Sequence, residues 1–489
     1  MRYPADVVRG ARARRGSRAV VCLAGLVLWG CTFDPSGGTG TAVGDGGVAD
    51  SRPGQPDAEV TISCTAGERL CFGHIIETCN DAGDGFVEAD AVPCALSCEP
   101  NAGEPLCTAP SNIPVEDAAT CGGNAPALAP TSGSVTVTIS GGVERIICTN
   151  DCGSGASEIL RVAALDQGSD PDIAWFCLSR LSIPDGVIFS VDPLVTSSIA
   201  LVVAGDVSIA GTIALDAHAA SSTAGGLAGP GGGAGAPAAP NGMGGLMGLG
   251  RCPGLGGGHA TGGSIAAGTG GSGAGYRGLG GDGGDGISSG GGGPDDGTKV
   301  TGPQGGTAAC DGDASLVPLV GGGGGGSGGD GSCGGNCGWP GGGGGGALQI
   351  AGRGQFEVSG ALTAVGGAGY GDATGNLSHG GGGGGGAGGA LLLEAPTLTL
   401  SGSFVVIGGV GGLAGAGLGG DGGGSGTRVN VAGGDNGADA DADGEGGAGG
   451  GGSAGLVRLN SLIQPTCPAG VTPGASCATG TVTVIPDPL

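Results

Sequence analysis

Three aspartates in the C-terminal part of the chain have a spacing that suits a hard cation. Asp439, Asp441 and Asp443 alternate with alanine and precede Gly444, so three carboxylates can converge in one loop, and carboxylate oxygens are ligands that Ca²⁺ prefers. A twelve-residue calcium loop ends in a bidentate Glu, but the equivalent position here is Gly450. The pattern predicts either a solvated acidic loop or a weak calcium site, and no other cofactor is expected.

Two further patterns have the residue types of a site. Residues 280–288 fit a nonapeptide whose Asp carboxylates bind calcium between tandem copies, but the pattern occurs once. Gly-x-Ser-x-Gly occurs at Ser327 and Ser453, yet a nucleophile needs a strand-to-helix elbow. In a chain with 127 glycines among 489 residues, such matches arise by chance. We therefore expect no enzyme.

Six cysteines lie within residues 61–110, a stretch with few aliphatic residues. Disulfides persist in oxidising compartments, and a segment this short cannot build a sufficient core without them. We expect a three-disulfide module, although six cysteines permit 15 pairings. The cysteines are Cys64, Cys71, Cys79, Cys94, Cys98 and Cys107.

Two pairs of cysteines need separate consideration. Cys94 and Cys98 with His74 have the ligand types of a zinc site, which an oxidising compartment disfavours. Cys333 and Cys337 lie in a glycine-rich stretch, where a local disulfide would limit the entropy of the loop. We expect the second pair to be a disulfide candidate, with pairing undetermined.

The first 30 residues have the layout of a secretory signal, because an Arg-rich stretch precedes an apolar run from Ala19 to Trp29. Eleven apolar residues are too few to span a bilayer. The sequence Leu28-Trp29-Gly30-Cys31 resembles the lipobox of bacterial lipoproteins. The resemblance implies cleavage before Cys31 and its acylation. Residues 31–60, rich in Gly, Asp, Pro and Ser, are then expected to form a flexible tether.

An internal repeat emerges when three segments are aligned on Gly211, Gly360 and Gly402. Each glycine has apolar residues four and two positions before it and two and four after it. Period-two alternation is typical of strands with one buried face, and the glycine marks a bend between them. The aligned residues are Val207, Ile209, Ile213 and Leu215; Phe356, Val358, Leu362 and Ala364; and Leu398, Leu400, Phe404 and Val406.

Apolar stretches precede each unit at 199–203, 348–350 and 391–393, and another follows at 456–459. Units that cannot bury a face alone stack on their neighbours. The sequence therefore predicts an all-β fold, a parallel β-solenoid or β-helix-like body over residues 111–466, followed by a C-terminal tail, 467–489.

Long glycine-rich insertions interrupt this body at about 219–346, 366–389 and 408–454. All three emerge at the same point of the repeat unit, as insertions on one face of a solenoid do. Glycine pays a high ordering entropy, but its lack of a side chain permits close approach. The insertions are either mobile or packed as extended polyproline II-like strands.

The charge of the chain limits its partners. Residues 1–30 contain six of the 17 basic and one of the 43 acidic residues, so their removal changes the net charge from −26 to −31. Such an acidic surface repels nucleic acids, whose phosphates need basic residues to neutralise them. Lys299 is the one lysine of the chain, so a polybasic lipid-binding patch is also absent. We expect no nucleic acid, but a membrane through the lipid anchor, and envelope polymers or other cells.

The cysteine order that begins Cys71-Phe72-Gly73-His74 resembles a six-cysteine module of myxobacterial surface proteins. The stretches 181–186 and 393–402 resemble those that separate glycine runs in glycine-rich surface lipoproteins of myxobacterial type. The composition is also similar to that of mycobacterial glycine-rich cell-wall proteins. These resemblances imply a location and offer no catalytic residues.

The sequence thus predicts a non-catalytic, exported lipoprotein of the outer membrane or cell surface, structural or adhesive in role. A periplasmic or secreted location is the alternative. A calcium- or ligand-binding surface module is the second hypothesis. A polysaccharide-active β-helix enzyme is the third, but its acid/base candidates Asp206, Glu357 and Glu394 are isolated in the sequence and aromatic residues make up 3%.

Overall fold

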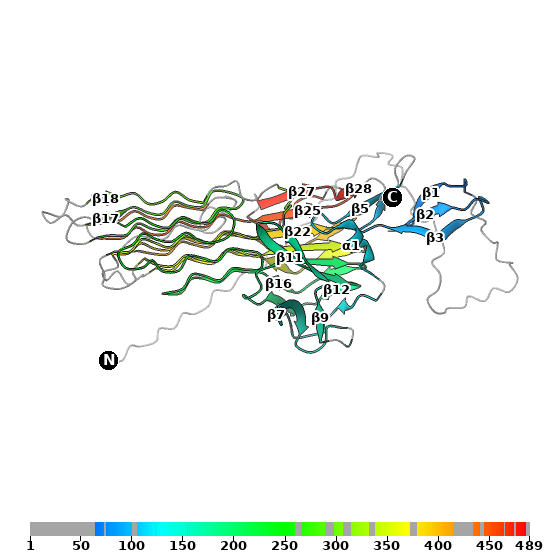
Figure 1. The fold of residues 1–489 in the computed structure, drawn as a ribbon, viewed down its shortest axis with the longest axis horizontal. Helices are drawn as coiled ribbons and strands as arrows, with labels where there is room; N and C mark the ends of the chain where they lie inside the picture. Colours follow the sequence, from blue (N-terminus) through cyan, green and yellow to red (C-terminus); the bar gives the residue numbers. More distant parts are fainter. Residues whose placement is uncertain are drawn as a thin grey trace, which may run out of the picture. The chain divides into compact units, whose positions relative to one another are not determined.

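The computed structural model describes residues 64–485, apart from internal gaps, and strands dominate the described part (Figure 1). Its helix is the short α1 (Val115–Thr120). None of the described helical residues forms a segment long and apolar enough to cross a bilayer. The expected all-β class is confirmed. The gaps are residues 73–74, 100–104, 123, 154, 156, 260–265, 289–297, 307–313, 332–337, 372–378, 415–433, 441–444, 464 and 474–475.

Three large, mainly parallel sheets form the body. The first has the order β10 (Ala163–Gln167), β11 (Asp170–Leu178), β14 (Ser198–Val203), β19 (Ala347–Gly352), β22 (Ala390–Glu394), β25 (Leu456–Asn460), β27 (Cys477–Gly480). The second has the order β23 (Leu398–Leu400), β20 (Phe356–Val358), β15 (Val207–Ile209), β12 (Arg180–Ile183), β6 (Ala127–Leu128). The third has the order β26 (Val471–Thr472), β24 (Ser403–Val405), β21 (Ala361–Thr363), β16 (Thr212–Ala214), β13 (Ile188–Val191), β7 (Ser134–Ser140), β8 (Val143–Cys148), β9 (Glu158–Leu160).

The strand register matches the alignment on the three glycines. Val207 is paired with Phe356, which is paired in turn with Leu398. The strands after the bend agree as well, since Leu362 of β21 lies between Ile213 and Phe404. The preceding apolar stretches form β14, β19, β22 and β25 of the first sheet in the same parallel order. Each repeat unit thus contributes one strand to each sheet.

The core lies between the three sheets. The apolar residues that alternate along the strands are buried, and Phe189, Ile213, Leu362 and Phe404 have no exposed surface. Full burial of such side chains contributes roughly 1.5–3 kcal/mol each. This burial fixes the register, because a shift by one residue would turn every apolar side chain outward.

The bend between the second and third strand of each unit requires glycine. The amide of Gly211 donates to the carbonyl oxygen of Ile183, and that of Gly360 donates to Ile209 in the next unit. A β-carbon on Gly360 would lie 1.9 Å from the oxygen of Gly211, and one on Gly402 would lie 2.2 Å from that of Gly360. The backbones of successive bends are therefore in direct contact, with no room for a side chain between them.

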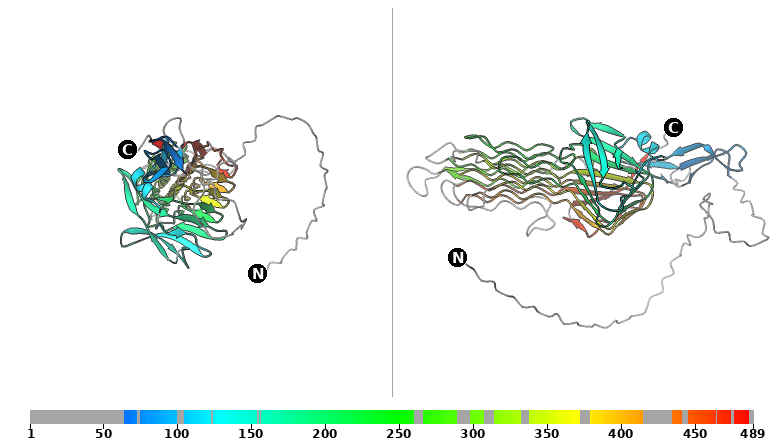
Figure 2. Two further views of the ribbon diagram at one scale, coloured as in Figure 1. Left: turned by 90° about the vertical axis from the view of Figure 1, so that its right-hand side faces the viewer. Right: turned by 90° about the horizontal axis from the view of Figure 1, so that it is seen from below.

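The insertions leave the body after β16, β21 and β24 and return into β19, β22 and β25, in agreement with the predicted insertion points. We call the described residues of 215–346, 364–389 and 406–455 the glycine bundle. Its extended tracts run side by side, away from the sheets and back (Figures 1 and 2). A two-stranded hairpin, β17 (Gly286–Ser288) and β18 (Thr298–Val300), also lies within it.

Hydrogen bonding in the bundle repeats every three residues, as the tract 380–389 illustrates. Successive amides donate in turn to the tracts 321–331, 445–455 and 364–371, and then the cycle begins again. The donors of the first set are Gly381, Gly384 and Ala387, those of the second Gly382, Gly385 and Gly388, and those of the third Gly383, Gly386 and Gly389. A rotation of one third of a turn per residue is polyproline II geometry. Of the two alternatives left by the sequence, the described tracts show the packed one.

Carbonyl groups of the same tract accept hydrogen bonds from other tracts. Gly342 donates to the oxygen of Gly384, Gly271 to that of Gly382, and Gly409 to that of Gly386. Each hydrogen bond contributes only about 1 kcal/mol net, while ordering a backbone residue costs about 1–2 kcal/mol. We infer that the tracts stay ordered because paired strands of the body fix their ends.

The six-cysteine segment folds into short antiparallel strands. One sheet has the order β1 (Arg69–Phe72), β2 (Ile75–Cys79), β3 (Phe86–Pro93), and a second has the order β28 (Thr483–Ile485), β5 (Leu106–Ala109), β4 (Cys98–Glu99). Because β28 comes from the C-terminal tail, the tail shares a sheet with the six-cysteine segment. The strands β26 and β27 of the tail likewise extend two sheets of the body past the expected boundary at 466.

Arg353 joins this segment to the body. Its Nε donates to the carbonyl oxygen of Ala95 at 2.8 Å, and its Nη2 donates to that of Ala118, in α1, at 2.8 Å. Burial lowers the pKa of the Arg353 guanidinium from its ordinary value. The disulfide Cys121–Cys177 ties the end of α1 to β11 as well.

Candidate functional site

The structure brings the two acidic patterns of the sequence together. The amide of Asp285, just before β17, donates to Oδ1 of Asp439 at 3.0 Å, and the amide of Asp282 donates to Oδ1 of Asn436 at 2.9 Å. These residues, with Gln304, line a polar hollow of about 490 Å³. Asp441 and Asp443 lie outside the described residues.

Lys299 lies between the carboxylates of this acidic hollow. Its Nζ is 2.6 Å from Oδ2 of Asp285 and 3.3 Å from Oδ2 of Asp439. The hydrogen bond to Asp285 has the largest effect on the pKa of Lys299, followed by the hydrogen bond to Asp439. Together with the negative charges of these two carboxylates, they raise this pKa above its ordinary value of 10.5. An ammonium group therefore occupies the position between these two carboxylates. Across the described ranges, no cluster of three or more His, Cys, Asp or Glu residues is placed to hold a metal ion.

Sequence reasoning missed the role of Lys299. The residue is the one lysine in an acidic chain, which was a signal that its position matters. The β17–β18 hairpin brings Asp285 beside Lys299, whereas Asp439 lies 140 residues further along the chain and meets Lys299 through the packing of the glycine bundle.

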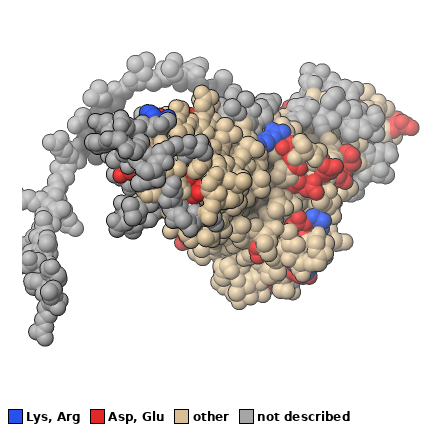
Figure 3. Space-filling view, turned by 60° about the vertical axis from the view of Figure 1, so that its left-hand side comes forward, with Lys and Arg blue, Asp and Glu red and all other residues tan. Residues whose placement is uncertain are grey.

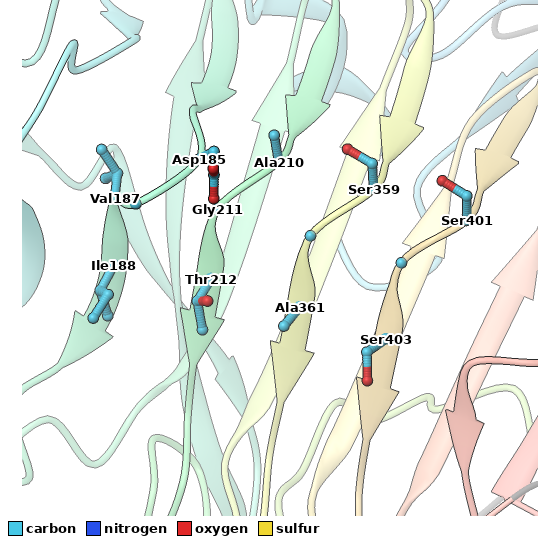
Figure 4. A pocket seen from close by; sticks show the side chains of 13 residues that line it. Asp185, Val187, Ile188, Ala210, Gly211, Thr212, Ser359, Ala361, Ser401 and Ser403 are labelled. Atoms are coloured by element: carbon cyan, nitrogen blue, oxygen red, sulfur yellow. The ribbon is translucent and has the colours of Figure 1, made fainter. Parts of the chain in front are cut away.

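A shallow groove of about 670 Å³ runs across the bends of successive repeat units (Figure 4). Its walls carry small side chains, among them Thr212, Ser359, Ser401 and Ser403, and Asp185 supplies a carboxylate at one end. General acid–base catalysis needs titratable groups within reach of one reacting atom. The groove lining offers hydroxyl groups, backbone and the apolar side chains of Val187 and Ile188, and Asp185 is the one titratable side chain in it.

The acid/base candidates of the enzyme hypothesis have structural partners. Glu394 is fully buried and accepts hydrogen bonds from Ser111 Oγ at 2.5 Å, Gln349 Nε2 at 2.5 Å and Asn460 Nδ2 at 2.9 Å. The amide of Ser111 donates to the same carboxylate at 3.0 Å. Four donors around one buried carboxylate indicate a structural role, because a buried charge must be hydrogen-bonded.

The other two acid/base candidates lie at the surface. Glu357 is exposed on β20, and Asp206 accepts a hydrogen bond from the amide of Gln355 at 2.9 Å. Glu357 lies in β20 and Asp206 directly precedes β15, two strands of the second sheet, whereas Glu394 lies on β22 of the first sheet. The structure therefore does not gather the three carboxylates on one strand face.

The two serines of the Gly-x-Ser-x-Gly matches lie inside the glycine bundle. Ser327 and Ser453 have no exposed surface. Ser327 Oγ accepts a hydrogen bond from the amide of Leu246 at 2.7 Å, and Ser453 Oγ donates to the oxygen of Ala454 at 3.4 Å. Both side chains therefore serve the packing of tracts.

The cysteines of the six-cysteine segment form three disulfides, and the structure supplies the pairing that the sequence left open. They are Cys64–Cys79, Cys71–Cys98 and Cys94–Cys107. Cys148–Cys152 and Cys467–Cys477 are further pairs. Disulfides persist in oxidising compartments, so the protein is exported. Cys31, Cys333 and Cys337 lie outside the described residues.

Comparisons of the chain with protein-family models, curated proteins and solved structures found no match.

Proposed function

We propose that this protein is a non-catalytic lipoprotein of the bacterial cell surface, structural or adhesive in role, with a β-solenoid body that supports the glycine bundle. The single observation that carries the proposal is the bundle itself. Its described tracts extend away from the sheets and come back to the next strand of the body, so the insertions project beyond the sheets as one hydrogen-bonded bundle.

The solenoid assignment is supported by the three parallel sheets. Each repeat unit adds one strand to each sheet, and the bends stack on one another through Gly211, Gly360 and Gly402. A stack of this kind lets insertions vary outside without disturbing the core. It suits a protein whose projecting insertions make contacts while its body provides rigidity.

Export is supported by the disulfides, and the lipobox-like sequence before Cys31 supports the membrane anchor. Metabolic labelling with a clickable fatty acid in a bacterial host tests the anchor directly. We expect label in the wild type and in Cys22→Ser, a matched control within the signal, and loss of label in Cys31→Ser. Label that is missing from every variant would overturn the lipoprotein proposal.

Protease treatment of intact cells tests the surface location. Cleavage of the body from outside, with a periplasmic marker protein left intact, is the expected result. A body that is cleaved only after the outer membrane is opened would contradict a surface location and favour the periplasm.

A second proposal, a calcium- or ligand-binding surface module, is supported by the polar hollow that Asp282, Asp285 and Asp439 line. Calcium would have to displace the Lys299 ammonium that pairs with Asp285 and Asp439. Calorimetry with millimolar calcium tests it. Heat that is lost in Asp285→Asn but retained in Asp185→Asn, a carboxylate in the bend groove, would support the module. Absence of heat in the wild type would remove it.

A further inference from the structure

A group of exposed apolar side chains lies on the outside of the glycine bundle. Met243, Leu246, Met247 and Leu249 follow one another on the tract 243–250, with Leu255 on the next tract. Their exposed fractions are 58%, 42%, 56%, 64% and 43%. We call these five residues the apolar ridge. Contiguous exposed apolar surface marks an interaction site more often than scattered single residues do.

The backbone under the ridge is fixed. The carbonyl oxygens of Met243, Leu246 and Leu249 accept hydrogen bonds from the amides of the buried tract 321–331, at 2.9–3.1 Å. Gly248 donates to the oxygen of Gly254 at 3.0 Å and so joins the ridge tract to the tract of Leu255. The ridge side chains are therefore presented by a hydrogen-bonded surface.

The tract that carries most of the ridge has no charged residue. Residues 217–250 contain no Asp, Glu, Lys or Arg, although the chain has a net charge of −26. The next residue, Arg251, pairs with Asp170 through two contacts of 2.7 Å. Figure 3 shows one face of the molecule, on which much of the described surface carries no charged side chain. An anionic surface thus meets less repulsion along this span than at the acidic parts.

The shape of the ridge favours a deformable partner. Its side chains are separated along the tract by Gly244, Gly245, Gly248 and Gly250, so the tract itself places no other large side chain between them. A rigid protein partner would need hollows that match them, whereas lipid acyl chains adapt to projecting apolar groups.

We propose that the apolar ridge is a membrane contact, which inserts its Leu and Met side chains into the headgroup and upper acyl region of a phospholipid layer. This inference rests on the proposed envelope location. The anchor at Cys31 would keep a bilayer near, because the 32 residues between Cys31 and Cys64 span at most about 110 Å when extended. The ridge would then lay the glycine bundle along the membrane.

The test uses the mature chain of residues 32–489 without an acyl group, which keeps every described residue, and vesicles of phosphatidylethanolamine and phosphatidylglycerol. The ridge variant is Leu246→Gln/Leu249→Gln/Leu255→Gln. The control variant, Leu160→Gln/Leu194→Gln/Ile463→Gln, replaces three side chains that are 53%, 73% and 76% exposed elsewhere. We expect vesicle affinity to fall about tenfold or more in the ridge variant and to stay within about twofold in the control.

Methionine oxidation gives a second readout at the ridge. Met243 and Met247 are the two methionines after Met1, and an exposed thioether is converted to the sulfoxide by peroxide. Vesicles should slow the oxidation of both residues in the wild type and in the control variant, but not in the ridge variant, where both methionines remain as reporters.

The proposal is overturned if the acyl-free chain does not bind vesicles, or if the ridge variant and the control variant bind vesicles with equal affinity. Self-association in buffer that the ridge variant abolishes, without vesicle binding, would assign the ridge to a second copy instead. Fatty-acid labelling of Cys31 is measured separately, so loss of the anchor and loss of the ridge contact are distinguishable.

Discussion

The amide of Gly384 donates to the carbonyl oxygen of Gly326 at 2.7 Å, and a β-carbon on Gly384 would lie 1.9 Å from the oxygen of Ser272. Three tracts therefore meet at a point that has no room for a methyl group. We expect Gly384→Ala to destabilise the protein by about 3 kcal/mol, the upper end of the usual range for overpacking, as measured by calorimetric unfolding.

Gly258→Ala is the matched control for this change. Its β-carbon would find its nearest neighbour at 3.5 Å, an ordinary contact with Val300. It should leave the unfolding temperature almost unchanged. An equal loss of stability in Gly384→Ala and Gly258→Ala would show that the bundle is not packed as described.

The buried carboxylate of Glu394 holds three segments of the body together. Replacement by alanine leaves the donors of Ser111, Gln349 and Asn460 without their acceptor, and a buried unsatisfied donor costs about 1–3 kcal/mol. We expect Glu394→Ala to lose about 3 kcal/mol or more in denaturant unfolding. The exposed Glu357→Ala should change little, and a similar loss there would contradict the structural role of the network.

The disulfides differ in how much chain they close. Cys121–Cys177 has a sequence separation of 56 and Cys148–Cys152 a separation of 4. In the chain-entropy model the first stabilises by about 4 kcal/mol and the second by about 2 kcal/mol. Thermal unfolding of the two double Cys→Ser variants should therefore show the larger decrease for the first pair. The reverse order would show that strain or residual structure outweighs loop closure.

The ion pairs of Lys299 predict a dependence of stability on alkaline pH. Because the folded state raises the pKa of Lys299 above 10.5, its contribution is fully present below the unfolded pKa and is lost as the pH rises through the folded pKa. The difference in melting temperature between wild type and Lys299→Gln should persist from about pH 8 to pH 10 and shrink above about pH 11.

Lys299→Arg provides the control, since a guanidinium keeps its charge at higher pH. It should follow the wild type near neutral pH and retain its stability beyond the pH at which the wild type loses it. A wild-type advantage that is independent of pH up to the highest value would rule out the ion pairs as its cause.

The sequence predicted the features that depend on local alternation. The positions of Gly211, Gly360 and Gly402 and the apolar residues around them determined the register of the second and third sheets, because one buried face excludes a shift by one residue and the stacked glycines of the bends exclude a shift by two. The points at which the insertions leave the body followed from the same alignment.

Features that depend on distant partners were not predictable. The order of the tracts rests on neighbours such as Gly326 for Gly384, and a run of glycines carries no side chain to specify which neighbour it meets. The pairing of Cys71 with Cys98 was one of several that the spacing allowed. The position of Lys299 beside Asp439 required the fold of the whole bundle.

The three-residue repeat of hydrogen bonding in the glycine bundle limits how the gene can change in length. After an insertion of three residues in both arms of one hairpin, every amide again faces the same neighbouring tract as before. An insertion of one or two residues turns the rest of the arm by a third or two thirds of a turn and directs its alanines and serines into places that admit only hydrogen. We therefore expect natural insertions and deletions in the arms to come in multiples of three residues.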